Sequence, residues 1–203
     1  SLAQAHNLRA RREVARVPDP PRFDSMRLLG PHNQRNAEVA WVACREFGVS
    51  EEVARRAVAA EPPIEHGLEL VAQRRGVLYV NDSKCTTVTA LKVALEAFDR
   101  PVLLLAGGKF KGGDLAGLAG LLRERVRAVG LYGACRDVFE AARQGVAPLF
   151  YDPTLEEAAL RLADLARSGD VVLLAPATAS YDQYANYMVR GEDFRRIVGE
   201  VPA

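Results

Sequence analysis

The residues best suited to chemistry are gathered in the heptapeptide Asn81-Asp82-Ser83-Lys84-Cys85-Thr86-Thr87. It carries a carboxylate, an ammonium group and three hydroxyls, between an apolar run at 76–80 and a helical pattern that begins at Val88. The start of a helix has free backbone N–H groups and a positive dipole end, both of which favour anions. The segment can therefore bind a phosphate, a metal ion or a small acid. Ordinary helix capping with a solvated Lys84 explains the same residues without a ligand.

Two further polar loops follow apolar runs. Residues 107–114 form a glycine-rich loop with two lysines, and residues 175–184 form a loop of small residues around Ser180 with tyrosines beside it. A flexible turn explains the first loop taken alone, and a capped helix start explains the second. Three such loops on one rim favour a binding cleft. A nucleophilic triad of Ser180, His66 and Asp82 is conceivable, but no G-x-S-x-G sequence supports it.

Strands and helices alternate from residue 62 onward, and this alternation must position the three loops. The pattern predicts strands at 68–71, 77–80, 102–106, 126–132, 148–151 and 171–175, and helices at 88–98, 114–124, 134–143, 154–167 and near 191–200. Such alternation is typical of an α/β fold, here a Rossmann-like, mainly parallel sheet with helices on both faces. Ligands of these sheets sit beyond the carboxyl ends of the strands, where all three loops are expected.

Residues 1–61 have a different character. The arginine- and proline-rich stretch 1–29 predicts an irregular or partly disordered segment. Apolar residues at helical spacing then predict an amphipathic helix over 33–47, and Ser50 is the expected cap of a second helix. The residues of the predicted buried stripe are Ala37, Ala40, Trp41, Cys44 and Phe47. The prolines after Glu61 stop helical structure, so we place a domain boundary between 1–61 and 62–203.

Composition narrows the function classes. The 203 residues are 49% hydrophobic with a formal net charge of +1, typical of a soluble protein and without an electrostatic case for nucleic acid or an anionic membrane. No apolar run reaches membrane-spanning length, and nothing resembles a signal peptide. The three cysteines show no C-x-x-C spacing, so neither a zinc site nor a disulfide framework is indicated, and we expect reduced thiols in the cytoplasm. The start at Ser1 predicts a processed product or a fragment.

Several motifs, in order along residues 30–200, resemble those of the Mur ligase family. His32-Asn33-Gln34-Arg35-Asn36-Ala37 resembles the H-N-x-x-N-A opening of a central-domain helix, and residues 64–69 resemble the hinge to the C-terminal domain. Residues 81–86 are similar to the N-D-S-K-A-T signature of the members that add D-glutamate. Residues 176–184, with Arg190-Gly191 and Phe194, are similar to the tail P-A-x-A-S-x-D-Q-F…R-G…F.

The resemblance implies a D-glutamate-binding C-terminal domain at 62–203, preceded by a remnant of the central ATP-binding domain at 1–61. The implied enzyme uses ATP and Mg²⁺ to join D-glutamate to UDP-N-acetylmuramoyl-L-alanine through an acyl phosphate, in peptidoglycan precursor synthesis. The family's G-T-x-G-K-[ST] loop and its carbamylated lysine are missing from the chain. We therefore expect no catalytic or metal-binding residue in this fragment, which should be inactive alone.

The resemblance also assigns roles to individual residues. The contacts it implies for D-glutamate are Thr86, Lys111, Ser180, Tyr181 and Tyr187. Those it implies for ATP are Asn36, Asp82 and Lys84, at the base or ribose, the ribose and the phosphates respectively. The hinge arginine of the family is Gly67 here, which leaves the nucleotide contact at this position open. The intact protein is expected to be a cytoplasmic monomer without a nucleic-acid or membrane partner. The alternatives are a sister Mur-type or folylpolyglutamate-type amide ligase and a non-catalytic doubly wound binding module.

Overall fold

The computed structural model describes residues 15–142 and 147–202. These residues separate into two compact units, and the chain passes from the first to the second between Glu61 and Pro62. The short stretch Leu28–Pro31 also belongs to the second unit. Residues 15–29 contain neither helix nor strand, while the rest of the segment predicted to be irregular, 1–14, lies outside the described residues.

The first unit is built on two helices, α1 (Pro31–Arg45) and α2 (Glu51–Ala60). The hydroxyl of Ser50 caps α2 by accepting from the backbone N–H of Val53 at 3.3 Å, as predicted. A small core holds the unit together, and its buried residues are Phe23, Ala37, Trp41 and Ala54.

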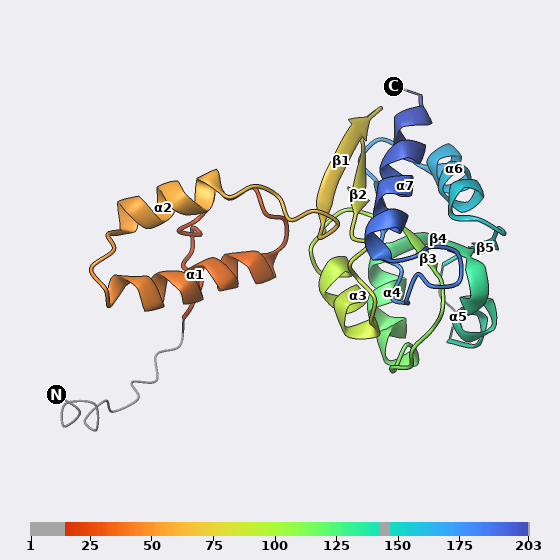
Figure 1. Ribbon diagram of the computed structural model, residues 1–203, viewed down its shortest axis with the longest axis horizontal. Helices are drawn as coiled ribbons and strands as arrows, with labels where there is room; N and C mark the ends of the chain where they lie inside the picture. Colours follow the sequence, from red (N-terminus) through yellow and green to blue (C-terminus); the bar gives the residue numbers. More distant parts are fainter. Residues whose placement is uncertain (1–14, 143–146, 203) are drawn as a thin grey trace. The chain divides into compact units, whose positions relative to one another are not determined.

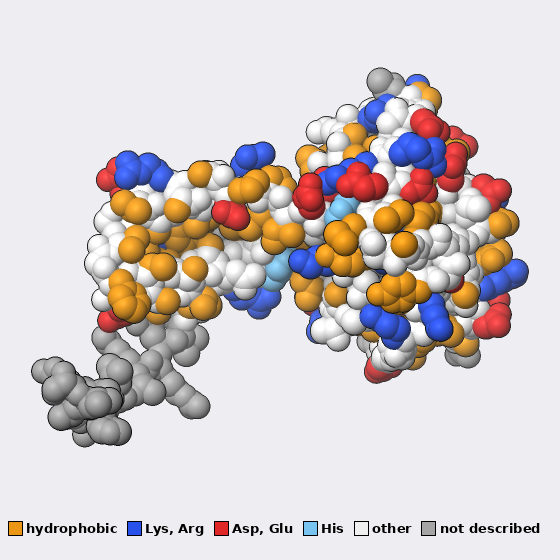
Figure 2. Space-filling view, in the orientation of Figure 1, with side chains coloured by type: hydrophobic (Ala, Val, Ile, Leu, Met, Phe, Trp, Pro, Cys, Tyr) orange, Lys and Arg blue, Asp and Glu red, His pale blue; other side chains and the backbone are white. Residues whose placement is uncertain are grey.

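Only two of the five residues in the predicted buried stripe are buried. Ala37 and Trp41 are buried, but Ala40, Cys44 and Phe47 are exposed, and Phe47 leaves 88% of its surface open to solvent. Figure 2 shows hydrophobic side chains gathered on the visible face of this unit. The helical spacing marked an apolar face correctly, but the described part of this unit has too few residues to cover it.

The second unit is organised around a sheet flanked by helices (Figure 1). The sheet has six strands in the order β1-β2-β6-β3-β4-β5. Its strands are β1 (Glu69–Arg74), β2 (Val77–Asn81), β3 (Val102–Gly107), β4 (Val126–Tyr132), β5 (Leu149–Tyr151) and β6 (Val171–Leu174). Strands β1 and β2 pair antiparallel, and every other pairing is parallel. The predicted mainly parallel α/β sheet is therefore confirmed.

Helices connect the strands of the second unit. They are α3 (Val88–Leu95), the 3₁₀ turn η2 (Ala116–Leu118), α4 (Ala119–Arg125), the 3₁₀ turn η3 (Gly133–Cys135), α5 (Arg136–Ala142), α6 (Leu155–Leu165) and α7 (Tyr187–Glu200). The final helix begins at Tyr187 rather than near residue 191, because the Asn186 side chain caps it by accepting from the Val189 N–H at 3.0 Å. The helix predicted over 114–124 is also wrong at its start, where a 3₁₀ turn precedes α4.

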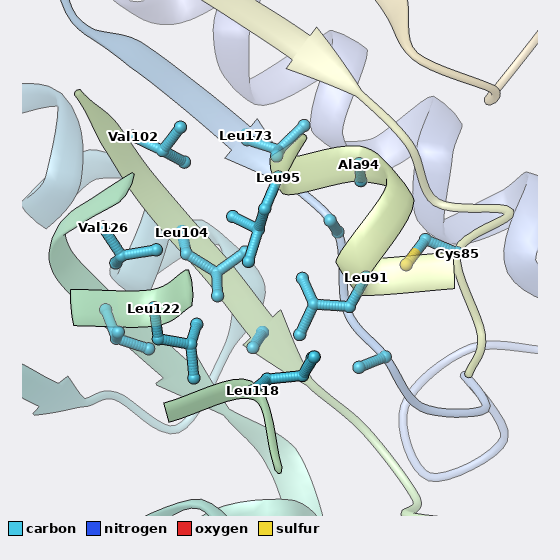
Figure 3. Packing of buried hydrophobic residues seen from close by; sticks show 14 of the residues in the cluster. Cys85, Leu91, Ala94, Leu95, Val102, Leu104, Leu118, Leu122, Val126 and Leu173 are labelled. Atoms are coloured by element: carbon cyan, nitrogen blue, oxygen red, sulfur yellow. The ribbon is translucent and has the colours of Figure 1, made fainter. Parts of the chain in front are cut away.

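The two faces of the sheet carry separate cores. Alternate residues of β3 point to opposite sides: Leu104 packs under α3 and α4 (Figure 3), whereas Leu103 and Leu105 pack under α6 and α7. Side chains of successive strand residues point to opposite faces, so a strand covered on both sides must be apolar throughout. The expected helices on both faces are thus present. In the part of the chain that the structure describes, no helix has the length and apolarity needed to cross a membrane.

Candidate functional site

Three polar loops lie at the carboxyl edge of the sheet. Strand β6 is paired with β2 through Asn81 and Leu174 and with β3 through Leu105 and Leu174, so the loops that leave these strands are neighbours. We call them loop A (Asn81–Thr87), loop B (Gly107–Asp114) and loop C (Pro176–Tyr184). Loops B and C are joined directly, because the backbone groups of Lys109 and Ala179 exchange hydrogen bonds of 2.8 and 3.0 Å. The predicted common rim is confirmed.

Asn81 opens loop A and shapes it through both ends of its side-chain amide. Its Oδ1 accepts from the N–H of Ser83 at 3.1 Å, and its Nδ2 lies 3.0 Å from Nδ1 of His66. Since Nδ2 can only donate, Nδ1 of His66 is the acceptor in this contact. Nε2 lies 3.7 Å from a carboxylate oxygen of Glu192 on α7. The buried His66 therefore supports the start of loop A.

Asp82 is held in a buried position behind the rim. Its Oδ1 accepts from the backbone N–H of Leu68 at 3.2 Å. Burial raises the pKa of Asp82 to about 6, against the opposing effects of the Leu68 N–H and the Lys84 charge. Lys84 itself is exposed. A carboxylate facing inward and an ammonium facing solvent can act on different parts of one ligand.

Lys111 and Thr86 meet across loops A and B. The Nζ of Lys111 donates to Oγ1 of Thr86 at 3.4 Å, although the two residues are 25 positions apart. Both groups are at the surface, and the next residue, Thr87, caps α3 by accepting from the N–H of Ala90. An ammonium group and hydroxyls beside a helix N-terminus form a suitable place for a carboxylate.

The other predicted contacts for an amino acid are spread over loop C and the start of α7. Ser180 is buried, and its carbonyl accepts from the N–H groups of Gln183 and Tyr184 at 3.1 and 2.8 Å. Tyr181 is exposed over 72% of its surface. Tyr187 is half-buried, with its ring edge-to-face on His66 at a centroid distance of 6.2 Å. Ser180 thus has a visible structural role, whereas Tyr181 is open to a ligand.

One sequence hypothesis is not supported at this rim. Within the described residues no hydrogen bond links Ser180, His66 and Asp82, so the nucleophilic triad is not formed. Asn36 lies on α1 in the first unit, where its amide donates to Oδ1 of Asn33 at 3.3 Å. No group of three or more His, Cys, Asp or Glu side chains over residues 15–142 and 147–202 is arranged to hold a metal ion.

Arg190 is a central residue of the rim that residue-level reasoning missed. It is fully buried on α7, and its guanidinium donates to one carbonyl in each loop: Ser83 at 2.9 Å, Thr178 at 3.3 Å and Gly107 at 3.4 Å. A signal did exist. Arg190 lies one turn before Phe194, on the apolar face of the helix, where a charged residue is unusual.

A comparison with family models finds a match over residues 67–178, with the model described as Mur ligase, glutamate ligase domain. Among curated proteins, the chain is similar to UDP-N-acetylmuramoylalanine–D-glutamate ligase of Nitratidesulfovibrio vulgaris strain DP4, with 62% identity over 97% of this chain and 45% of that protein. The enzyme of the same name from Lawsonia intracellularis is 54% identical, over 99% of this chain and 45% of its own length. The chain therefore spans somewhat less than half of these relatives.

Solved structures show the same fold at low sequence identity. A folylpolyglutamate synthase of Mycobacterium tuberculosis, complexed with ADP and AMPPCP, superimposes with a TM-score of 0.62 and 17% identity, over 88% of this chain and 42% of that one. The UDP-N-acetylmuramate-alanine ligase of Thermotoga maritima gives a TM-score of 0.61 at 14% identity, over 86% and 38% of the two chains.

Proposed function

Because this chain belongs to the Mur ligase family, we propose that it supplies the D-glutamate-binding part of a ligase that joins D-glutamate to UDP-N-acetylmuramoyl-L-alanine. The two curated relatives described above carry the name of that activity. The observation that carries the proposal is the meeting of Lys111 with Thr86 across two loops, beside the capped start of α3. This arrangement offers a cation and hydroxyl donors to a carboxylate, which D-glutamate presents twice.

The proposed contacts divide between the two ends of the amino acid. Lys111 and Thr86 bind one carboxylate, while Ser180, Tyr181 and Tyr187 on the other side of the rim bind and enclose the remainder of the ligand. The amine must be left free and directed towards the acyl group of the second substrate, because amide formation depends on holding the reacting atoms close together. Loops on a rigid sheet serve this purpose, since the strands set where each loop begins.

The domain assignment belongs to the same proposal. Residues 62–203 are the D-glutamate-binding domain, and residues 1–61 are a remnant of a central ATP-binding domain. This view is supported by the exposed large apolar side chains in the described part of the first unit, which are Val39 on α1, Val53 on α2 and Phe47 in the turn after α1. An apolar helix face is normally covered. The share of the relatives that the chain spans, 45%, is also consistent with further domains in the intact protein.

The proposal includes ATP and Mg²⁺, but this chain does not fit them by itself. Asp82, Lys84 and Asn36 are proposed to contact the ribose, the phosphates and the base or ribose. However, the sequence has no G-x-x-x-x-G-K-[ST] loop, and the described residues have no cluster of metal ligands. Nucleotide and metal must therefore be held mainly by other parts of the enzyme. We further propose that the intact protein is a cytoplasmic monomer that acts without nucleic acid or membrane.

The second candidate is a related ligase that adds a different amino acid, and a folylpolyglutamate synthase shares the fold. That likeness shows the fold alone. The N-D-S-K stretch that forms loop A distinguishes the two readings, because its resemblance is to the D-glutamate-adding members of the family. A binding module without catalysis is the third reading, and the intact protein's activity would separate it from both.

The test is an NMR titration of the isotopically labelled chain with D-glutamate. Amide signals of loops A, B and C are expected to shift in a saturable manner, with L-lysine and folate producing no comparable change. L-Glutamate is the stereochemical control, and weaker binding is expected for it. Equal responses to D-glutamate and L-lysine, or shifts confined to residues away from the rim, would contradict the proposal.

A further inference from the structure

Arg190 forms no salt bridge with any of the residues that the structure describes. Its side chain is fully buried, and its acceptors are the hydroxyl of Ser83 and the carbonyl oxygens of Ser83, Gly107 and Thr178. Among the described residues, none of its partners is a carboxylate. Burying a charge without a counter-charge is costly, even when hydrogen bonds satisfy the donors. An anion bound at the rim would reduce this cost.

The other arginines of α7 show that this arrangement is specific to Arg190. Arg195 pairs with Glu69 at 2.6 Å, and Arg196 pairs with Glu156 at 2.7 Å. Both side chains are partly exposed, and neither contacts a loop of the rim. The helix therefore places two ordinary, paired arginines on its outer side and one buried, unpaired arginine beneath the three loops.

Arg190 also acts on the position of Tyr187 through a single hydroxyl. Oγ of Ser83 accepts from Nε of Arg190 at 2.9 Å and donates to the carbonyl of Tyr187 at 2.7 Å. This chain of hydrogen bonds joins loop A to the first turn of α7. A planar guanidinium with five N–H donors can serve all these acceptors at once, which a lysine ammonium with three donors cannot.

We propose that Arg190 is a positioning residue that sets the spacing of loops A, B and C, and that its unpaired charge makes the rim select an acidic amino acid over its neutral amide. This inference rests on the proposed function and goes beyond it by naming the origin of the selectivity. Spacing and charge have separate consequences. Loss of the planar guanidinium weakens the binding of every ligand at the rim. Loss of the charge changes the preference between D-glutamate and D-glutamine.

The experiment measures dissociation constants for D-glutamate and D-glutamine by NMR titration of the whole 203-residue chain. Arg190→Met is expected to reduce the preference for D-glutamate by about tenfold, the order of effect of one unit charge in a partly buried site. Arg190→Lys keeps the charge but not the planar set of N–H donors, so it should weaken the binding of both ligands and preserve the preference for D-glutamate. Arg196→Met, on the same helix, should change neither quantity.

An unchanged preference in Arg190→Met, or wild-type affinities in Arg190→Lys, would overturn the inference. If Arg190→Met does not fold, as judged by circular dichroism, Arg190→Lys and Ser83→Ala decide. Both variants keep the charge and lose some of the hydrogen bonds that set the spacing of the loops. Weaker binding with an unchanged preference for D-glutamate supports the inference, and unchanged binding refutes it.

Failure of the proposed function can be recognised separately. If the wild-type chain binds no D-glutamate, that function is wrong, but the spacing role can still be measured without ligand. Arg190→Lys should then shift amide signals in all three loops, 12 to 107 positions away in sequence, while Arg196→Met leaves them in place. Shifts confined to α7 would refute the spacing role as well.

Discussion

At the scale of single residues, the buried carboxyl of Asp82 predicts a pH dependence of stability. Its folded pKa is raised by burial from 3.8 to about 6. A carboxyl with a raised pKa favours the folded state fully below its unfolded pKa, and this contribution is lost as the pH rises through the folded pKa. The free energy of unfolding should therefore fall by about 2–3 kcal/mol between pH 4 and pH 7 on account of Asp82.

Urea unfolding at a series of pH values measures this effect. Asp82→Asn keeps an oxygen that can accept from the Leu68 N–H but removes the titration. The free energy of unfolding of the variant should therefore rise relative to that of the wild type between pH 4 and pH 6. Above pH 6 the difference should stay constant. Asp137→Asn is the control, because Asp137 is exposed on α5. Parallel pH profiles for wild type and Asp82→Asn would show that Asp82 is not buried as described.

Lys111 provides the second prediction at this scale. Lys111→Ala should weaken D-glutamate binding by about tenfold to a hundredfold, the worth of a hydrogen bond between charged groups of roughly 1.5–3 kcal/mol. Lys109→Ala is matched to it, since the two lysines share loop B and the same charge. The bonds of Lys109 to Ala179 are made by its backbone, so they survive the substitution. Equal losses in both variants would indicate a general effect of loop charge rather than a contact made by Lys111.

At the scale of elements, the packing of α7 against His66 depends on the absence of a side chain at Gly191. A Cβ at Gly191 would lie 2.2 Å from Nδ1 of the buried His66 ring, so no larger residue fits there without displacing the histidine. Gly191→Ala should therefore destabilise the second unit by about 1–3 kcal/mol, as overpacking does. It should also disturb loop A, because His66 supports Asn81.

Gly199 on the same helix is the matched control. Nothing lies within 4 Å of a Cβ built there, and the residue is exposed. Gly199→Ala should stabilise the unit by up to roughly 0.5–1 kcal/mol through the lower backbone entropy of alanine in the unfolded chain. Thermal unfolding of both variants checks the pair, and a destabilised Gly199→Ala beside a neutral Gly191→Ala would contradict the described packing.

At the scale of the whole molecule, we expect this polypeptide alone neither to hydrolyse ATP nor to make an amide bond. Phosphoryl transfer requires a phosphate-binding loop and metal ions that position the transferred group, and most of the rate comes from electrostatic stabilisation. The sequence has no such loop. A coupled assay for phosphate release, with D-glutamate and UDP-N-acetylmuramoyl-L-alanine present, measures this directly.

Turnover above a sample without protein would contradict that expectation. It would place the nucleotide site within residues 1–203 and overturn the division into a D-glutamate-binding domain and a central-domain remnant. A variant of Lys84, the residue proposed to contact the phosphates, is a necessary companion, because a contaminating ATPase gives the same signal. Lys84→Ala should abolish any genuine turnover by this chain and leave a contaminant's activity unchanged.

The sequence by itself determined most of the elements and the common rim of the three loops. Strand β4 was predicted over the residues it occupies, 126–132, because an apolar run bounded by polar residues is a local property of the chain. The common rim followed from the same local pattern, since parallel strands all present their carboxyl ends at one edge. The prediction was less accurate where the start of a helix depends on a capping side chain, as at Asn186 before α7. A capping residue does not change the hydrophobic periodicity from which the helix is predicted.

Only the tertiary structure decided which side chains meet. Two sets of contacts depend on β6 lying between β2 and β3: the contact of Lys111 with Thr86, and the hydrogen bonds of Arg190 to the three loops. Strand order is a long-range property that hydrophobic periodicity does not contain, so neither contact could be worked out from residue spacing. The exposure of Phe47 was undetermined for the same reason: periodicity identifies an apolar face, but the residues that cover it come from elsewhere in the fold.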